Sequence, residues 1–349
     1  MAMRFRLRQE GYGRARSRCP VGARLYNEMV NELRWHPLLK QWVCVAAHRQ
    51  DRPQMPADWC PFCPGSGRVP DHYDVHLYAN DFAAFQIDNP PFSPETGLFR
   101  TTGARGVTDV ILYHPSHTLA PAQMTAAHWR KVVDLWTTRY RNLAAIPDIA
   151  YVYAFENTGA AIGVTMPHPH GQMYAFPFVP PLVETELNSA REYHAEHGEC
   201  IYCRLLADEL ADGRRVVAAN VSFAAFVPFA ARFPAEMQIC ARRHFGALPE
   251  AGEEEKTDLA ALIKLVRMKY DNLFGFPMPL MMVLRQSPAK GEHPYFHFHI
   301  DFLPIQRSAT KLKYLAGVES GCGTFLNDTA AEAKAEELRQ TEPRTEREV

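Results

Sequence analysis

The amino-acid sequence predicts an α+β fold made of two tandem, pseudo-two-fold related halves, each a mainly antiparallel β-sheet with one long helix. One observation is a series of motifs that occurs twice, in the same order, along the 349 residues. Another is that the spacings between these motifs nearly agree in the two copies. In addition, each copy contains short strands rich in Val, Phe, Tyr and Ile and a single amphipathic helix. Duplication of one supersecondary unit therefore accounts for most of the chain.

Both copies begin with a Cys-x-x-Cys pair and end with a His-x-His run. The first comprises Cys60-x-x-Cys63, Phe82-Ala-Ala-Phe85, His117 with Leu119, a helix ending in Arg139-Tyr-Arg-Asn-Leu143, a strand at 150–155 and His168-Pro-His170. The second comprises Cys200-x-x-Cys203, Phe223-Ala-Ala-Phe226, His244 with Leu248, a helix ending in Lys269-Tyr-Asp-Asn-Leu273, a strand at 280–284 and His297-Phe-His299. From the second cysteine to the first phenylalanine the gaps are 19 and 20 residues, and from the helix-ending leucine to the final histidine run they are 25 and 24.

The helix of the first copy is expected over 125–143, where apolar residues recur at helical spacing. These residues are Ala126, Trp129, Val132, Val133, Trp136 and Tyr140. Such a stripe is typical of a helix packed on a sheet. The first copy is longer than the second between its phenylalanines and its middle histidine. There, residues 90–106 carry proline, glycine and threonine and are predicted to form a loop.

Composition narrows the class of protein. A formal net charge of −1 with 22% charged residues provides no basic field for nucleic acid. No apolar run reaches the length of a membrane span, and the N-terminus lacks the hydrophobic stretch of a signal peptide. We therefore expect a cytoplasmic protein that acts on small molecules, without nucleic-acid or membrane partners.

Four segments are expected along the chain. Residues 1–24, rich in arginine, are predicted to be a basic, disordered tail, and residues 25–185 the N-terminal half with the catalytic site. Residues 186–327 are predicted to be the C-terminal half. Residues 328–349 begin with alanine-rich helical sequence and end in mixed charges without an apolar face, so we expect a helical tail that frays.

The eight cysteines point to metal rather than disulfides, because four of them form the two Cys-x-x-Cys pairs in a chain without a signal peptide. A two-residue gap lets both thiolates reach one ion from a tight turn. Histidines distant in the sequence can complete a tetrahedral zinc site. The sequence therefore predicts structural zinc.

The run Pro167-His168-Pro169-His170-Gly171-Gln172 predicts nucleotidyl transfer. Two prolines hold alternate histidines in an extended backbone, so that both point the same way. One imidazole can be fixed by a metal while the other attacks phosphorus. Gln172 can hydrogen-bond a phosphoryl oxygen without supplying a charge or a base.

Motifs spread over roughly residues 35–320 resemble the galactose-1-phosphate uridylyltransferase family, relatives of the histidine-triad proteins that work through a covalent uridylyl-histidine. These motifs are Arg49-Gln-Asp-Arg52, Trp59-Cys60-Pro-Phe-Cys63-Pro-Gly65, Asn80-Asp81-Phe82, Phe155-Glu156-Asn157, the Pro167 to Gln172 run, and Arg307-Ser-Ala-Thr-Lys311 followed by Lys313. The resemblance implies two histidine-triad-like halves. It also implies a homodimer in which part of each active site comes from the neighbouring subunit.

The resemblance assigns roles to individual residues. It makes His170 the nucleophile and Gln172 the group that holds the nonbridging oxygens. The matching zinc ligands are Cys60, Cys63, His117 and His168, with His114 as a less favoured rival of His117. Residues implied to line the nucleotide and its phosphates are Asn80, Asp81, Asn157, Gly163, Val164 and Thr165. Those implied to meet phosphate charge are Arg49, Arg52, Lys311 and Lys313, and Glu319 is a sugar contact.

A second metal has two alternative ligand sets. The repeat predicts a second zinc on Cys200, Cys203, His244 and His297. Some relatives hold another metal, zinc or iron, with a glutamate and three histidines, of which Glu186, His297 and His299 match. The remaining position falls on Arg285, which stays protonated and cannot be a ligand. The cysteine set is therefore preferred.

The expected reaction is a ping-pong transfer of UMP, in which UDP-glucose uridylylates His170 and galactose 1-phosphate then takes the uridylyl group. The acceptor hexose stays open, because Val318 and Phe325 stand where relatives often have a tyrosine and a glutamine. One alternative is a nucleoside-diphosphate-sugar phosphorylase or adenylyltransferase using the same histidine. A second alternative is a non-catalytic, zinc-stabilised nucleotide-binding protein.

Overall fold

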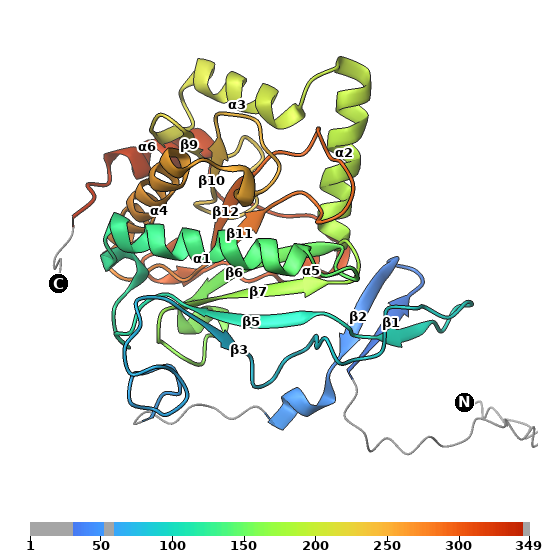
Figure 1. Cartoon of the computed structure of the whole chain (residues 1–349). Coiled ribbons are helices and arrows are strands. Elements are labelled where there is room, and N and C mark those ends of the chain that lie inside the picture. Colours follow the sequence, from blue (N-terminus) through green and yellow to red (C-terminus); the bar gives the residue numbers. More distant parts are fainter. Residues whose placement is uncertain (1–30, 52–58, 345–349) are drawn as a thin grey trace, which may run out of the picture.

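The computed structural model describes residues 31–51 and 59–344. Its central element is one nine-stranded sheet in the order β3-β5-β7-β6-β11-β12-β10-β9-β8, with every neighbouring pair antiparallel (Figure 1). The strands are β3 (His76–Ala79), β5 (Val107–Leu112), β6 (Tyr151–Thr158), β7 (His170–Phe176), β8 (Val216–Ala219), β9 (Phe223–Phe226), β10 (Met237–Ala241), β11 (Leu280–Arg285) and β12 (His299–Pro304). The predicted strands at 150–155 and 280–284 correspond to β6 and β11.

The two predicted halves are joined edge to edge within this sheet. Strands β3, β5, β7 and β6 come from the first half, and the other five come from the second. The junction is the antiparallel pair of β6 and β11, in which Phe155 lies opposite Val283. Both strands are largely buried, so the pairing removes two apolar edges from solvent. The α+β prediction of two antiparallel, helix-backed halves is confirmed, and the structure adds that they share one sheet.

One face of the sheet is covered by α1 (Ala126–Ala144) and α4 (Glu253–Phe274), which also pack against each other (Figure 1). The helix predicted over 125–143 is confirmed as α1, and Thr125 caps it by accepting a hydrogen bond from the His128 amide at 3.1 Å. The stripe from Trp129 to Tyr140 is buried in the main core. In the second half, α2 (Pro181–His197) and α3 (Ile201–Asp212) pack on the opposite face.

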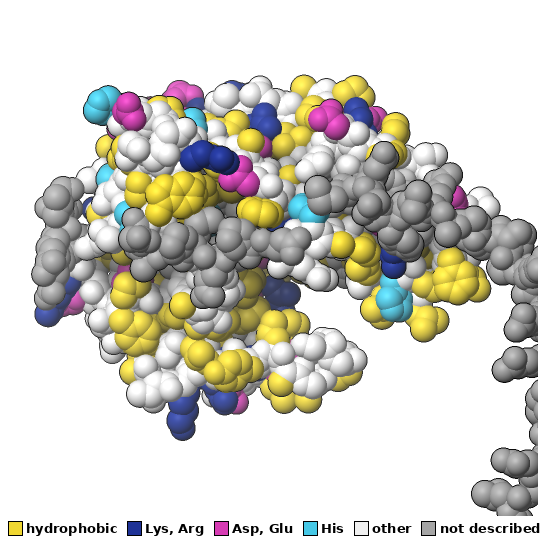
Figure 2. Space-filling view, turned by 90° about the horizontal axis from the view of Figure 1, so that it is seen from below, with side chains coloured by type: hydrophobic (Ala, Val, Ile, Leu, Met, Phe, Trp, Pro, Cys, Tyr) yellow, Lys and Arg dark blue, Asp and Glu magenta, His cyan; other side chains and the backbone are white. Residues whose placement is uncertain are grey.

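A small sheet of β1 (Glu32–His36), β2 (Gln41–Val45) and β4 (Thr101–Gly103) projects from the body (Figure 1). Strand β4 lies in the segment 90–106 that we predicted to be a loop, and for these three residues the prediction was wrong. The strand forms because β1, far away in the sequence, supplies its hydrogen-bonding partner, with Glu32 opposite Gly103. Local composition does not reveal such a partner. The exposed hydrophobic side chains on these strands and the loops beside them are Leu38, Leu39, Val43, Leu98 and Phe99. Figure 2 shows hydrophobic side chains at the surface on the right side of the view.

The repeated Phe-Ala-Ala-Phe motif has different backbone structure in the two halves. Phe223–Phe226 forms β9, whereas Phe82 to Phe85 lie outside the named strands. An asparagine precedes both copies and accepts a backbone hydrogen bond from the first phenylalanine at 2.9 Å, from Phe82 to Asn80 and from Phe223 to Asn220. The two halves therefore share the asparagine turn before the motif, but only the second half forms a strand at the motif itself.

The remaining elements are short, apart from the C-terminal helix. They are η1 (Ala47–Asp51), η2 (Pro121–Gln123), η3 (Ala160–Ile162), η4 (Leu248–Glu250), β13 (Gln306–Ser308), β14 (Lys311–Leu312), α5 (Gly317–Cys322) and α6 (Ala331–Gln340). Among the described helices, none is both long and apolar enough to cross a membrane.

The helix expected after residue 328 is α6, but it does not fray over the described residues. Ala331, Ala335 and Leu338 are buried against the main core. The buried ammonium of Lys269 donates to the carbonyls of Leu338, Arg339 and Thr341 at 2.9, 3.1 and 3.0 Å. These carbonyls end the helix and would otherwise lack partners. The predicted tail at 1–24 lies outside the described residues, and the four segment boundaries stay a prediction.

Candidate active site and metal centres

The first cysteine pair and two histidines meet in one cluster. The ligand atoms of Cys60, Cys63, His117 and His168 all lie within 4.8 Å of one another. Nδ1 of His168 is 3.9 Å from Sγ of Cys60 and 3.7 Å from Sγ of Cys63, and Nδ1 of His117 is 3.5 Å from Sγ of Cys63. Two thiols and two imidazoles converging on one point form a donor set that fits a tetrahedral metal ion.

Hydrogen bonds fix the tautomer of His168. Its Nε2 must donate to the carbonyl of His114 at 2.8 Å, because a carbonyl can only accept. The hydroxyl of Tyr73 lies 3.0 Å from the same nitrogen and donates to the carbonyl of Phe62. Nδ1 is then unprotonated and turned toward the thiols, as a metal ligand must be. Tyr73 belongs to no motif, so this contact could not be predicted from the sequence patterns. His114, the rival considered for His117, takes part through its backbone.

Burial favours the uncharged forms of Cys60 and His168. It raises the pKa of Cys60 to about 11 and lowers the pKa of His168 to about 4. A bound divalent ion would instead favour the deprotonated form of Cys60, because the ion binds the thiolate and displaces the proton.

The second cluster repeats the first. Cys200, Cys203, His244 and His297 place their ligand atoms within 4.8 Å of one another. Nδ1 of His297 is 3.4 Å from Sγ of Cys203, and its Nε2 donates to the carbonyl of Ala241 at 2.8 Å. Burial raises the pKa of Cys203 to about 12 and lowers the pKa of His297 to about 4. The donor set and its tautomer match those of the first cluster.

The alternative set of Glu186, His297 and His299 does not gather around one point among the described residues. Nδ1 of His297 faces the cysteines. Glu186 instead lies 3.8 Å from Arg285, whose Nε donates to Asp301 at 2.8 Å. Burial opposes the charge on Arg285, but Asp301 and Glu186 outweigh it and raise its pKa. A fixed cation thus occupies the region in which the alternative metal was considered.

His170 opens β7 and is half-buried. Its Nδ1 donates to the carbonyl of His168 at 2.7 Å. This bond places the ring proton on Nδ1 and makes Nε2 the unprotonated, nucleophilic nitrogen. His299 has the same bond, to the carbonyl of His297 at 2.8 Å, but it is buried, with 2% of its surface exposed. Of the two related imidazoles, His170 is therefore the one in reach of a substrate.

His170 and Gln172 line a small pocket together with Asn80, Asp81 and a largely apolar wall. The wall consists of Pro61, Phe62, Tyr78, Phe82, Val110 and Met166. Asp81 accepts from the hydroxyl of Tyr78 at 2.7 Å and pairs with Arg68. The side-chain oxygen of Gln172 accepts from Tyr174 at 3.2 Å. Tyr78 and Arg68 both contact Asp81, which was predicted to bind the substrate. Neither of them belongs to a motif, so the sequence patterns did not predict their role.

The other predicted substrate-binding residues lie in three places. Arg49 donates to the carbonyl of Phe82 at 3.2 Å, next to the pocket, and Arg52 lies outside the described residues. Asn157 is on β6, and Gly163, Val164 and Thr165 follow η3, where Gly163 has the positive φ of 82° that favours glycine. Lys311, Lys313 and Glu319 do not line the described pocket around His170.

Lys313 and Glu319 form a buried ion pair, with Nζ and Oε1 2.6 Å apart. The hydrogen bond from Lys313 lowers the pKa of Glu319 to about 2. Lys311 is exposed on β14. Phe325, at a departure from the family pattern, packs on Phe233 with ring centroids 5.7 Å apart.

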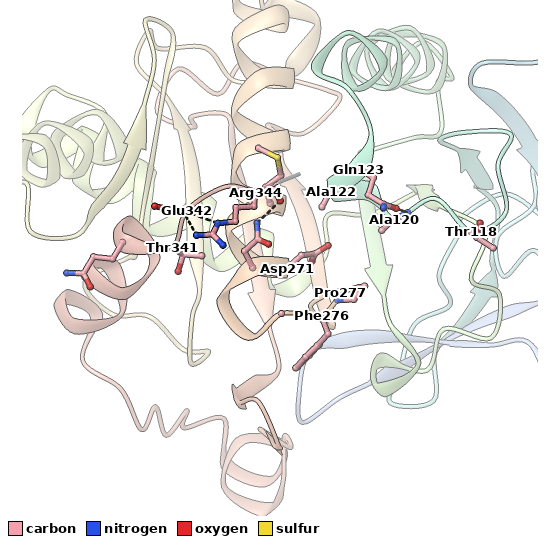
Figure 3. A pocket seen from close by; sticks show the side chains of 14 residues that line it. Thr118, Ala120, Ala122, Gln123, Asp271, Phe276, Pro277, Thr341, Glu342 and Arg344 are labelled. Carbon is pink, nitrogen blue, oxygen red and sulfur yellow. Dashed lines mark hydrogen bonds and ion pairs between the residues drawn. The ribbon is translucent and has the colours of Figure 1, made fainter. Parts of the chain in front are cut away.

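A larger pocket, of about 910 Å³, lies between η2, the end of α4 and the segment after α6 (Figure 3). Its labelled polar residues include Thr118, Gln123, Asp271 and Arg344, which come from distant parts of the chain. The described residues that line it include neither a cysteine nor a histidine. The smaller pocket is the one that His170 and Gln172 line.

Comparisons with known proteins agree with this geometry. The family model described as galactose-1-phosphate uridyl transferase, N-terminal domain, matches residues 24–180, and the model of the C-terminal domain matches residues 186–347. A galactose-1-phosphate uridylyltransferase of Thermotoga maritima is 39% identical, covering 89% of this chain and 98% of that protein. One of Rattus norvegicus is 34% identical, covering 88% and 86%. The chain belongs to the galactose-1-phosphate uridylyltransferase family.

Solved structures show the same similarity. A structure described as a uridylyltransferase superposes with a TM-score of 0.82 at 33% identity, covering 89% of this chain and 98% of that one. An ADP-glucose phosphorylase from Arabidopsis thaliana with bound ADP-glucose gives a TM-score of 0.71 at 25% identity, covering 89% and 99%.

Proposed function

We propose that this chain is a UDP-glucose–hexose-1-phosphate uridylyltransferase that passes UMP through a covalent adduct on His170. The observation that carries the proposal is the tautomer of His170, whose Nδ1 donates to the carbonyl of His168. Close relatives named for this activity support the choice of substrates.

The reaction consists of two displacements at one phosphorus. In the first, Nε2 of His170 attacks the α-phosphorus of UDP-glucose, and an N–P bond forms as the P–O bond to glucose 1-phosphate breaks. In the second, a phosphate oxygen of the hexose 1-phosphate attacks the same phosphorus, and the N–P bond breaks. One phosphate linkage replaces another of similar energy, so the exchange needs no ATP. Imidazole suits both steps, because it is a good nucleophile and a good leaving group at phosphorus.

Gln172 is proposed to hold the nonbridging oxygens. It leaves the same strand two residues after His170, so both side chains lie on one face of β7. Its side-chain oxygen accepts a hydrogen bond from the hydroxyl of Tyr174, so the amide N–H groups point away from Tyr174 and can donate to a phosphoryl oxygen. An amide donor stabilises charge on the phosphoryl group without acting as a base for water.

Zinc is proposed for the two Cys2His2 clusters. Cys60, Cys63, His117 and His168 would hold the first ion, and Cys200, Cys203, His244 and His297 the second. In each place a zinc ion would supply a fixed, closed structural site. His168 is two residues from the proposed nucleophile, and its carbonyl accepts a hydrogen bond from Nδ1 of His170, so fixing His168 also fixes the ring of His170.

A homodimer with shared active sites is proposed because Lys311, Lys313 and Glu319 stand apart from the described His170 pocket. In such a dimer they would approach the His170 of the second copy. Mixing two inactive variants tests this arrangement. A His170→Asn protein mixed with a Lys311→Glu protein after subunit exchange should regain about a quarter of wild-type activity, because half the dimers contain one intact site. Mixtures that stay as inactive as their components contradict sharing.

The nucleotide and sugar are tested directly. Radiolabel from UDP-glucose should attach to the protein and leave on addition of galactose 1-phosphate. The likeness to an ADP-glucose phosphorylase makes the adenylyl donor the rival, with ADP-glucose as the parallel substrate. Label that attaches only from ADP-glucose overturns the uridylyl assignment. In a His170→Gly variant, activity should be lost and partly restored by added imidazole.

A further inference from the structure

Strand β7, which carries His170, is closely contacted on the face opposite the pocket. His170 and Gln172 line the pocket, whereas Gly171 between them is buried on the opposite face of β7. A Cβ built on Gly171 would lie 2.1 Å from the hydroxyl oxygen of Tyr113 and 3.1 Å from the carbonyl oxygen of Phe155. Carbon atoms do not approach oxygen at 2.1 Å. The hydroxyl of Tyr113 therefore takes the space that a side chain at position 171 would need.

Tyr113 is itself held in place from several sides. It is fully buried, and its ring packs on Trp129 and Trp136 with centroids 5.4 and 5.8 Å away. Its amide donates to the carbonyl of Pro169 at 3.0 Å, and its carbonyl accepts from Nε2 of His128 at 2.5 Å. Tyr113 thus contacts the strand immediately before His170 through its backbone and immediately after it through its hydroxyl.

A buried ion pair lies beside this contact. Glu156 on β6 and Arg267 on α4 are each 1% exposed, and Oε1 of Glu156 is 3.1 Å from Nη1 of Arg267. The hydroxyl of Thr158 donates to Glu156 and accepts from Nη2 of Arg267 at 3.0 Å. Phe155, the residue before Glu156, is paired with Gln172 across β6 and β7. The carboxylate therefore lies next to the catalytic strand on its core side.

Folding stability alone does not explain why a charged pair, Glu156 and Arg267, occupies this buried position. The surrounding core is apolar, with Ala154 and Met173 buried on the same face. Removing two charges from water costs several kcal/mol per ion, and well-packed apolar residues in their place are often equally or more stabilising. Polar contacts are directional, however, and they fix one geometry where apolar packing tolerates several.

We propose that Tyr113 and the Glu156–Arg267 pair are positioning residues for the transfer reaction, which set the backbone at Gly171 and thereby aim the imidazole of His170 and the amide of Gln172. The inference rests on the proposed function of His170. All three residues are buried, and none of them lines the described pocket around His170. Their effect is on the distance and angle at which Nε2 of His170 meets phosphorus, and the rate of transfer is sensitive to this geometry.

The first test removes a single oxygen atom with Tyr113→Phe and uses Tyr270→Phe as a matched control. Tyr270 is also fully buried, on α4, and its hydroxyl donates to the carbonyl of Ala235 at 2.7 Å in the second half. For Tyr113→Phe we expect kcat at saturating substrates to fall at least about tenfold, with KM for UDP-glucose changed less than about threefold. Tyr270→Phe should lower Tm at least as much and keep kcat. A kcat for Tyr113→Phe equal to that of the control overturns the proposal.

The second test exchanges the ion pair for neutral groups with Glu156→Gln combined with Arg267→Met. The double variant removes both charges of the pair together, so neither Glu156 nor Arg267 leaves the other as an isolated buried charge, and we expect the protein to fold. The rate of adduct formation per folded molecule, in a single turnover, should still fall at least about tenfold. A double variant that forms the adduct at the wild-type rate contradicts a positioning role for the pair.

The wild-type protein separates the two proposals. If it forms the adduct and both sets of variants match it, the positioning inference fails and the proposed function stands. If the wild type forms no adduct with any nucleotide sugar, the proposed function fails, and the positioning inference falls with it.

Discussion

His170 differs from its counterpart in the duplicated half in only a few contacts, and these decide which imidazole can react. Both histidines donate from Nδ1 to the carbonyl two residues earlier. His299 is enclosed, with Tyr202 4.9 Å from its ring and Asp301 3.9 Å from its Nε2. At the position of Asp301 the first half has Gln172, which brings no negative charge to a site for phosphates. The first half therefore leaves its histidine accessible, as the proposed nucleophile must be, whereas the second half encloses its histidine in a buried polar core.

Gln172→Ala tests the role of the amide at the residue scale. The variant should retain the fold, because Gln172 is half-buried and accepts one side-chain hydrogen bond, from Tyr174. We expect kcat to fall by about 10² to 10³, as when one donor is removed from an oxyanion site. Steady-state kinetics with UDP-glucose and galactose 1-phosphate measure this loss. A kcat within about threefold of wild type would show that the phosphoryl oxygens are held by other groups.

At the element scale, two clusters attach loops and helices to the sheet. The first connects the Cys-x-x-Cys turn to the start of β7, which carries the proposed nucleophile, and the second connects the start of α3 to the start of β12. Their consequences for activity should differ, because only the first reaches His170 through His168.

Metal removal tests this difference. The purified wild type should contain about two zinc ions per chain by elemental analysis, and Cys63→Ser and Cys203→Ser about one each. Cys63→Ser should lower the rate of adduct formation at least about tenfold, whereas Cys203→Ser should mainly lower Tm. A wild type that binds one ion and does not change with Cys203→Ser would refute the second metal site.

The C-terminal helix provides another prediction at this scale. Lys269→Met removes the ammonium that donates to three carbonyls at the end of α6. We expect unfolding to become easier by about 1–3 kcal/mol and the amides of α6 to lose hydrogen-exchange protection. The matched surface change is Lys131→Met, which breaks an exposed pair with Asp74 and should leave the stability nearly unchanged. Equal effects of the two substitutions would mean that Lys269 does not hold α6.

Much of this architecture can be predicted from local residue patterns, and the exceptions have identifiable causes. The stripe from Trp129 to Tyr140 predicts α1 because a helix repeats its core face within the segment itself. Strand β4 cannot be predicted in this way, because its pairing partner is β1. The docking of α6 depends on Lys269, which lies about 70 residues earlier in the chain. The same limit applies to the site: cysteine and histidine spacing predicts both clusters, whereas Tyr73, Tyr78 and Tyr113 act through contacts that have no sequence signature.

At the scale of the whole molecule, the pseudo-symmetric sheet buries two histidines whose neutral form is needed for the fold. Burial lowers the pKa of His168 and of His297 to about 4, below the ordinary value of about 6.5. The unfolded chain therefore binds protons between about pH 6.5 and 4 that the folded chain does not bind. Folding stability must rise with pH across this window and fall as the pH is lowered through it.

Denaturant unfolding of the metal-free protein measures this dependence. The free energy of unfolding should decrease by a few kcal/mol between about pH 6.5 and 4, since each pKa unit corresponds to about 1.4 kcal/mol. Replacing His297 by Gln should make the decrease shallower. A free energy that does not change over this range would contradict the buried, neutral state of both rings.

The most direct measurement is the intact mass of the metal-replete protein after incubation with UDP-glucose, followed by peptide mapping. We expect a mass increase of one UMP group on His170, which disappears when galactose 1-phosphate is added and is absent from His170→Asn. An unmodified mass with every nucleotide sugar, or an adduct on any other residue, would contradict this expectation.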